Sequence, residues 1–128
     1  MDSPSNRGVK IAAITNDGVT IAGHFGMAEY YKVVSTETGK IIAQEQRPKP
    51  HHMMHPDFEQ TQSHDHQDML APIRDCQVLL CGGMRMRAYE HAMAAGFQVV
   101  MTLGKIDDAI RAYLDGTLVS DMRRIRSQ

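Results

Sequence analysis

Runs of consecutive apolar residues mark the expected strands of a buried sheet. Residues 9–15 (VKIAAIT) are rich in β-branched side chains and end at the turn sequence NDG, which predicts a central strand. Shorter runs of the same kind predict strands at 77–83 and 97–102. Residues 28–36 and 40–46 flank the sequence ETG, whose glycine suits a tight turn, so together they predict a β-hairpin.

A different periodicity marks the expected helices. Apolar residues recur at helical spacing in residues 85–96 and 105–116. Each of these segments stops at a glycine that can cap a helix, Gly96 in the first and Gly116 in the second. A weaker pattern predicts a short helix at 69–75.

The order of these elements indicates the fold class. They follow one another as strand, hairpin, loop with a short helix, strand, helix, strand and helix. The strand–helix–strand unit within 77–102 implies a crossover between parallel strands, whereas the hairpin adds antiparallel strands at one edge. We therefore expect an α/β fold in which helices pack on a mixed sheet of about five strands.

The length of 128 residues allows one domain with a substantial core. We expect a flexible leader at 1–8, a single domain at 9–120 and a tail without a predicted element at 121–128. Three prolines predict a loop at 47–57. This loop opens a His/Met-rich insertion that spans 47–68.

Composition excludes several classes of protein. The formal charge of −1 gives no overall field that favours nucleic acid or an anionic membrane. No apolar run approaches the length of a membrane span. The start, MDSPSNRGVK, lacks the apolar core of a signal peptide, so we expect a cytoplasmic location.

Sulfur-containing residues are unusually frequent, with two cysteines and ten methionines. If Cys76 and Cys81 lie on one strand, their Cα atoms are roughly 16 Å apart at about 3.3 Å per residue, which is beyond disulfide reach. We therefore expect two reduced thiols. Five methionines in apolar surroundings are expected to fill gaps in the core. These are Met27, Met84, Met86, Met93 and Met101.

Two loops are expected at the carboxyl ends of the strands, where open α/β sheets bind ligands. One is residues 15–29 and the other is residues 81–87. Gly82 and Gly83 would let the backbone approach a ligand, and the following helix would offer free N–H groups at its positive end. Arg85 adds positive charge there, so this place suits an anion.

His24 lies in the sequence GHFG, between Gly23 and Gly26. These glycines would free the backbone to direct the imidazole outward, and imidazole is a common ligand of iron, copper, zinc and nickel. The alternative is a loop histidine that hydrogen-bonds its own turn. No phosphate-binding loop, nucleophile elbow, HExxH or CxxC motif is present, so the sequence does not support enzyme chemistry.

The insertion concentrates histidine and methionine in the stretch HHMMHPDFEQTQSHDHQDML. Imidazole together with thioether favours copper(I), or iron within a sulfide cluster, whereas histidines alone would serve zinc. A polar loop of this composition would also bind transition metals weakly without any biological role. The candidate metal ligands here are His51, His52, Met53, His55, His64 and His66.

Two stretches of the chain carry a family resemblance. AITNDGVTIAGHFGMAEYYKV and RDCQVLLCGGMRMRAYEHAMAAGFQVVMTLGKIDDAIRAYLDGTL together resemble the dinitrogenase iron-molybdenum cofactor biosynthesis family, the NifX-like or orange-protein-like domains. The match covers roughly residues 9–46 and 71–118. The resemblance implies a ribonuclease H-like domain that binds iron–sulfur or molybdenum-containing clusters. It also makes His24, in the HFG motif, the best candidate cluster ligand.

The sequence departs from this family in two places. Many relatives continue GGMG where this chain has Met84 and Arg85, which would make an anion site narrower or more basic. Residues 51–70 have no counterpart that aligns, so the resemblance does not explain the insertion.

Three functional hypotheses follow. The first is a non-catalytic carrier of an iron–sulfur, iron–molybdenum or molybdenum–copper cluster or its precursor, with cluster donor or acceptor proteins as partners, as in nitrogen fixation. The second is a mononuclear copper or zinc carrier that uses the insertion. The third is an enzyme or small-anion-binding module that uses the glycine loop alone. The chain would be a monomer, or a dimer linked by metal between two insertions.

Overall fold

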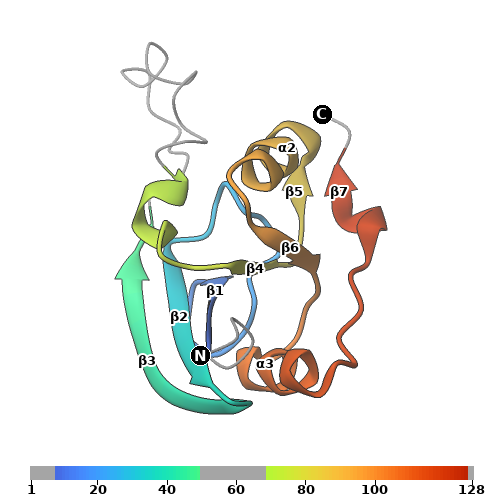
Figure 1. Cartoon of the computed structure of the whole chain (residues 1–128). Coiled ribbons are helices and arrows are strands. Elements are labelled where there is room, and N and C mark those ends of the chain that lie inside the picture. The colour runs from blue at the N-terminus through green and yellow to red at the C-terminus, as the bar shows by residue number, and fades with distance from the viewer. Residues whose placement is uncertain (1–7, 50–68, 127–128) are drawn as a thin grey trace.

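The computed structural model describes residues 8–49 and 69–126 (Figure 1). Its centre is a mixed five-stranded sheet with the order β3-β2-β1-β4-β6. The strands are β1 (Val9–Thr15), β2 (Tyr30–Glu37), β3 (Lys40–Pro48), β4 (Val78–Cys81) and β6 (Gln98–Met101). β1 pairs antiparallel with β2 and parallel with β4, and β4 pairs parallel with β6. The predicted α/β fold with a mixed sheet is confirmed.

The central and edge strands differ in burial, as their sequences require. In β1 the five residues from Ile11 to Thr15 are all buried, as expected for a strand covered on both faces. The edge strand β3 is exposed along most of its length and carries the charged residues Glu45 and Arg47, which discourage pairing with another chain. β3 continues through Pro48, two residues into the segment predicted as loop, because an edge position does not need the missing N–H.

The turn between β2 and β3 is formed by Thr38 and Gly39. Both have positive φ, 49° and 81°, as in the turns whose twist matches that of a two-stranded hairpin. Glu37 and Lys40 therefore face each other across the turn. The predicted hairpin is confirmed.

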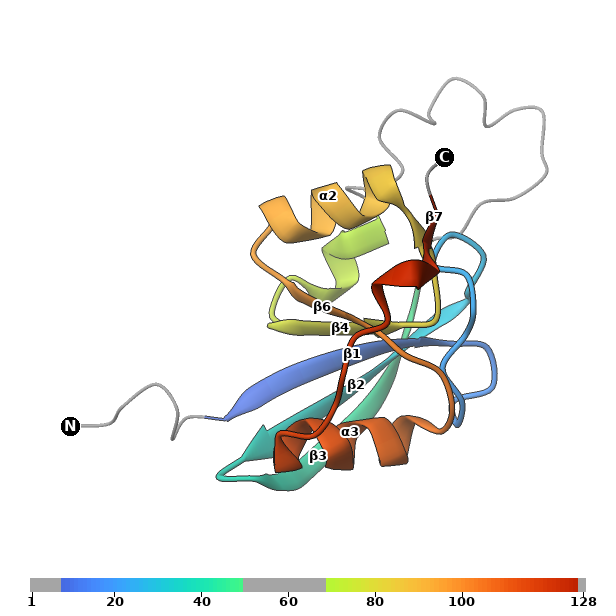
Figure 2. The ribbon, with the colours of Figure 1, turned by 90° about the vertical axis from the view of Figure 1, so that its right-hand side faces the viewer.

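Helices cover the two faces of the sheet. Helix α2 (Met86–Ala94) lies on one face and helix α3 (Ile106–Asp115) lies on the other (Figures 1 and 2). The short 3-10 helix η3 (Ala71–Ile73) shares the α2 face. Gly96 and Gly116 follow their helices with φ values of 97° and 79°, which confirms the two helix stops predicted from the sequence.

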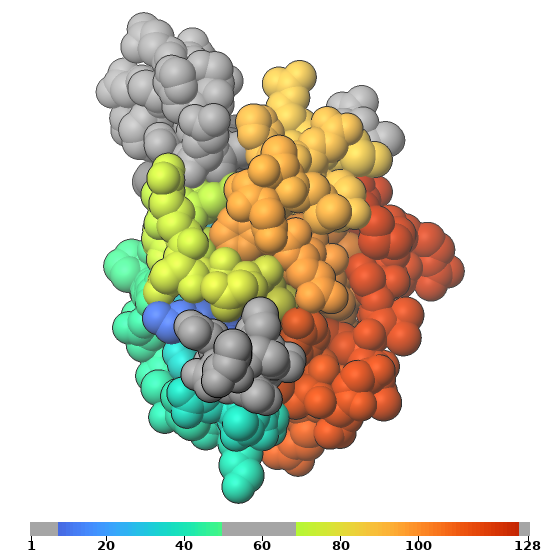
Figure 3. Space-filling model, viewed as in Figure 1, coloured from blue at the N-terminus to red at the C-terminus, as the bar shows by residue number. Residues whose placement is uncertain are grey.

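The chain after α3 is structured, although its sequence predicts no element. It runs along the side of the domain next to α3 and α2 (Figure 3), and the Asp121 N–H donates to the Met101 carbonyl at 2.9 Å. A 3-10 helix η4 (Met122–Arg124) follows, and β7 (Ile125–Arg126) then pairs parallel with β5 (Met84–Arg85). This segment lies against strand β6 and ties the end of the chain to the loop after β4.

The prediction that five methionines fill the core is correct for two of them and wrong for three. Met84 and Met101 are buried, whereas Met27, Met86 and Met93 are 54%, 41% and 48% exposed. The inward-facing residues of α2 are the small Ala88 and Ala92, which let the helix lie close to the sheet. The longer side chains of this helix, Met86 and Met93, lie on its outer side.

Both cysteines are buried and free, as expected from their spacing. In the ranges that the structure describes, no helix is long and apolar enough to cross a membrane.

Lys49 is a buried cation packed against the loop that follows β1, with 3% of its surface exposed. Its N–H donates to the Glu29 carbonyl at 3.0 Å and its Nζ donates to the Ala28 carbonyl at 3.2 Å. The Nζ also lies 4.8 Å from the centre of the Phe25 ring, a favourable position for a cation. Burial lowers the pKa of Lys49 to about 7.

This lowered pKa makes stability depend on pH. In the unfolded chain the pKa of lysine is about 10.4, so above about pH 7 the unfolded state binds a proton that the folded state does not. The free energy of unfolding should therefore rise from about pH 7 to about pH 9, by up to about 1 kcal/mol per pH unit. At higher pH it should fall, because burial raises the pKa values of Cys76 and Cys81 to about 12.

Urea unfolding of wild type and Lys49→Met across this range checks the prediction. The rise should be absent in Lys49→Met, because that side chain does not titrate. Lys40→Met, at the exposed end of the hairpin, is the matched control and should keep the rise. A wild-type profile without any increase would contradict the expected linkage.

Candidate functional site

The loops that follow β1, β4 and β6 meet at the carboxyl end of the parallel strands. The Gly82 N–H donates to the Ala22 carbonyl at 2.9 Å, and the Phe25 N–H donates to the Gly83 carbonyl at 2.9 Å. In the same way the Ile21 N–H donates to the Gly104 carbonyl at 2.9 Å. The structure thus brings together residues 15–29 and 81–87, as the sequence predicts.

This junction is also where the chain changes direction across the sheet. After β1 the chain continues to β2 on one side, whereas after β4 it continues through α2 to β6 on the other side. Ligands of open α/β sheets bind at such switch points, outside the carboxyl ends of the strands. The geometry therefore selects this end of the molecule as the candidate site.

Asp17 holds the first part of the loop after β1. Its Oδ1 accepts from the Thr20 and Val19 N–H groups at 2.8 and 2.9 Å, and the hydroxyl of Thr20 donates to Oδ2 at 3.0 Å. Hydrogen bonds from the backbone of Thr20 and Val19 lower the pKa of Asp17. This carboxylate is occupied by its own turn, as expected from the NDG sequence.

His24 begins the turn that projects from this loop. Its carbonyl accepts from the Met27 and Ala28 N–H groups at 3.2 and 3.1 Å, so the backbone alone closes the turn. The side chain is exposed and makes no hydrogen bond or ion pair with the residues that the structure describes. The imidazole can therefore contact a ligand that binds at the surface of the described structure.

The glycines around the site have different physical roles. A Cβ on Gly23 would meet no atom within 4 Å, so this position does not require glycine for space. A Cβ on Gly82 would lie 2.7 Å from the Ala22 oxygen and 2.9 Å from the Gly23 Cα. Gly82 is thus needed for the approach of the two loops, and its N–H is already donated to Ala22. This differs from the expected direct contact between Gly82 and a ligand.

The other two glycines take less specific positions. Gly26 lies inside the His24 turn and is half-buried. Gly83 is buried, and its carbonyl is occupied by the Phe25 N–H. Both glycines help to set the path of the loops.

Positive charge gathers where α2 begins. Arg85 is exposed and directly precedes the helix, with Arg87 in its first turn. In the backbone register of the β5–β7 pair, Arg126 is the partner of Arg85.

Exposed apolar side chains accompany these charges. Val19 and Met27 come from the loop after β1, Met86 from the start of α2 and Leu103 from the loop after β6. This group was not predicted from the sequence, because Met27 and Met86 were expected in the core. Their position in the motifs HFGM and RMR, next to candidate ligands, was the available signal.

The candidate ligands of the insertion lie outside the described residues. These are His51, His52, Met53, His55, His64 and His66. Within 8–49 and 69–126 no group of three or more His, Cys, Asp or Glu side chains is arranged to hold a metal ion. The structure therefore brings together His24 and the loop before Arg85, and it leaves the role of the insertion as a prediction.

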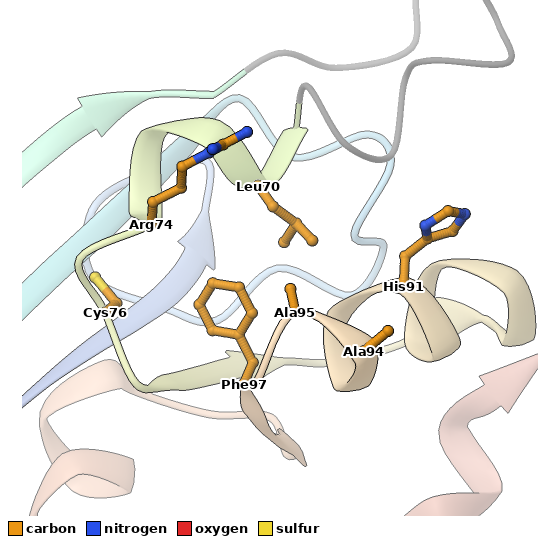
Figure 4. Close-up of a pocket in the computed structure, with 7 residues that line it drawn as sticks. All are labelled: Leu70, Arg74, Cys76, His91, Ala94, Ala95 and Phe97. Atoms are coloured by element: carbon orange, nitrogen blue, oxygen red, sulfur yellow. The ribbon is translucent and has the colours of Figure 1, made fainter.

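A separate cavity of about 540 Å³ lies between η3 and α2 (Figure 4). Its lining is mixed and includes the polar side chains of Arg74 and His91, and Leu70 and Phe97 point into the space between the two elements. The cavity shares no residue with the loops that carry His24 and Gly82. It is therefore distinct from the candidate site.

Together, the strand order and the helices on both faces define a ribonuclease H-like α/β domain. The family model for the dinitrogenase iron-molybdenum cofactor family matches residues 7–116, and the chain belongs to this family. The resemblance inferred from the HFG and CGGM motifs is confirmed. Among curated proteins, none matches the sequence significantly.

Solved structures share the fold at low sequence identity. The crystal structure of PH0822 is 24% identical with a TM-score of 0.70, and the alignment covers 88% of this chain and 96% of that one. The apo form of the orange protein from Desulfovibrio gigas is 24% identical with a TM-score of 0.65, covering 88% and 92%. A protein from Methanocaldococcus jannaschii is 11% identical with a TM-score of 0.59, covering 89% and 95%.

Substitution of Gly82 tests the loop junction. In Gly82→Ala the new methyl group would lie 2.3 Å from Leu103 Cδ2 and press on the backbone of residues 22 and 23. The side chain of Leu103 can move but the backbone cannot, so we expect a loss of about 1–3 kcal/mol in the free energy of unfolding.

Gly23→Ala is the matched control, because its methyl group enters open space. Its effect should stay within about 0.5 kcal/mol. Urea unfolding of both variants gives the comparison. Equal losses in the two variants would show that loop contact does not explain the glycine at position 82.

Proposed function

We propose that this protein is a non-catalytic binding or carrier protein for a metal–sulfur cluster or its precursor. The single observation that carries the proposal is the exposed imidazole of His24, which has no hydrogen-bond partner within 8–49 and 69–126 and stands on a turn closed by backbone hydrogen bonds at the switch point of the sheet. Membership in a family described by the iron-molybdenum cofactor supports the same class of cargo.

The chemistry of the site suits an anionic cluster. Clusters bridged by sulfide often carry negative charge, and Arg85 and Arg87 place positive charge at the start of α2. A neutral imidazole is a good ligand for iron, and it can bind only when it is deprotonated. His24 would supply the direct metal bond, and the arginines would supply attraction.

Within the part of the chain that the structure describes, the small number of available ligands suits transfer rather than permanent storage. Cys76 and Cys81 are both buried, so neither thiolate can reach a cluster on the surface of the described structure. A cargo held by one imidazole and by charge is exchanged more easily than one held by several thiolates. The exposed apolar residues Val19, Met27 and Leu103 would then contact the protein that donates or accepts the cluster.

Replacement of His24 tests the direct ligand. His24→Ala should lower the amounts of iron, molybdenum and acid-labile sulfide that copurify without air, because the metal bond is lost. The exposed side chain contributes little packing, so the free energy of unfolding should change by less than about 1 kcal/mol. Elemental analysis and urea unfolding measure the two effects.

His91→Ala is the matched control, since this half-buried histidine lies on α2 outside the loops. It should leave the amount of bound cluster unchanged. Equal cluster content in wild type and His24→Ala would exclude His24 as a ligand.

Charge reversal at Arg85 tests the electrostatic part. Arg85→Glu should weaken the binding of tetrathiomolybdate, a simple anionic metal sulfide, by a few-fold at low salt. A unit charge at a helix start contributes up to about 1 kcal/mol, and salt screens it. Arg111→Glu, on the exposed side of α3, is the control of equal charge. If both variants bind equally weakly, net charge rather than the position of Arg85 determines the affinity.

A further inference from the structure

Three sulfur atoms meet inside the protein at the carboxyl ends of β4 and β6. The Cys81 Sγ lies 3.6 Å from the Met101 Sδ and 3.9 Å from the Met84 Sδ. The three residues end β4, begin β5 and end β6, respectively. All three are buried, with exposed fractions of 0%, 3% and 0% for Cys81, Met84 and Met101.

The two separations from Cys81 are close to those between sulfur ligands of a single soft metal ion. Metal–sulfur bonds of about 2.3 Å place three sulfur ligands around one ion roughly 3.7–4.0 Å apart. Both measured contacts of Cys81 fall near this range. Small shifts of flexible methionine side chains would be enough to close such a site.

We propose that Cys81, Met84 and Met101 form a binding site for copper(I). Thiolate and thioether are soft ligands, and this combination selects copper(I) among the common metals. On binding, the copper ion takes the place of the thiol proton of Cys81, which leaves to solvent, and both thioethers donate a lone pair without any change in charge. The oxidation state of copper does not change.

Charge balance favours copper(I) over zinc at this place. One thiolate and one monovalent ion form a neutral unit, which can be buried among apolar residues. A divalent zinc ion in the same ligand set would leave one uncompensated positive charge in the interior, which is costly. The site is thus selective through its charge as well as through its ligands.

Burial raises the pKa of Cys81 to about 12, so without metal the thiol keeps its proton and copper(I) has to displace it. A backbone hydrogen bond from Gly83 and the charge of Lys49 act in the opposite direction and offset part of this effect of burial. Gly83 belongs to the loop that is hydrogen-bonded to the His24 turn. The sulfur site is buried, whereas His24 is exposed, and the two sites share no ligand. The copper proposal therefore stands independently of His24.

The experiment uses the full chain in a background that removes the metal ligands of the insertion. Each histidine at positions 51–66 is changed to asparagine and each methionine there to leucine. Copper(I) is added without air in competition with a chromophoric copper(I) chelator, and X-ray absorption reports the ligand atoms. We expect one copper per chain in an all-sulfur shell.

Variants distinguish a copper site from sulfur-rich packing. Cys81→Ala should abolish binding, and Met101→Leu or Met84→Leu should each weaken it at least tenfold while the similar side-chain volume preserves the fold. Cys76→Ala, the other buried thiol, and His24→Ala should bind copper as the background does. Circular dichroism confirms that each variant is folded.

Several results would overturn the proposal. One is an unchanged copper(I) affinity in Cys81→Ala or in both methionine variants. Another is a shell that contains nitrogen, or loss of copper in His24→Ala, because either would place the metal at the surface. Binding of zinc at Cys81 with comparable affinity would refute the selectivity argued from charge.

Discussion

The close approach between Gly82 and the backbone of Ala22 and Gly23 is the constraint on which the functional end of the molecule depends. Neighbouring strands are only about 4.8 Å apart, so the loops that leave β1 and β4 in the same direction compete for one space. Glycine resolves this competition, since any Cβ at position 82 would press on backbone atoms. The loops then exchange hydrogen bonds, and His24 is held at a fixed position relative to the start of α2.

This junction separates two kinds of metal-binding chemistry. Outside it lie an imidazole and several guanidinium groups, which suit a negatively charged cargo at the surface. Inside it lie a thiol and two thioethers, which suit a small soft cation that can be neutralised and buried. Gly82 and Gly83 follow Cys81 in the chain and are hydrogen-bonded to the loop that carries His24, so a movement of this segment would affect both places.

Local patterns in the sequence predict the fold well, because the fold is built from local rules. A buried parallel strand needs an apolar run, and a helix that ends needs a residue such as Gly96 or Gly116 with positive φ. The NDG turn and the Thr38–Gly39 hairpin follow from the same reasoning. The meeting of the two glycine-containing loops could also be predicted, since carboxyl ends of parallel strands share one edge of a sheet.

The sequence by itself therefore determined the strand and helix order, the family and the position of His24 in a loop at the end of a strand. Only the tertiary structure decided which neighbours each residue meets. It turned Met27 and Met86 outward, paired β7 with β5 and gave Gly82 a packing role. It also brought Met101 to Cys81 from twenty residues away. Periodicity along the chain specifies the face on which a side chain lies, but contacts between distant segments depend on how closely the elements pack.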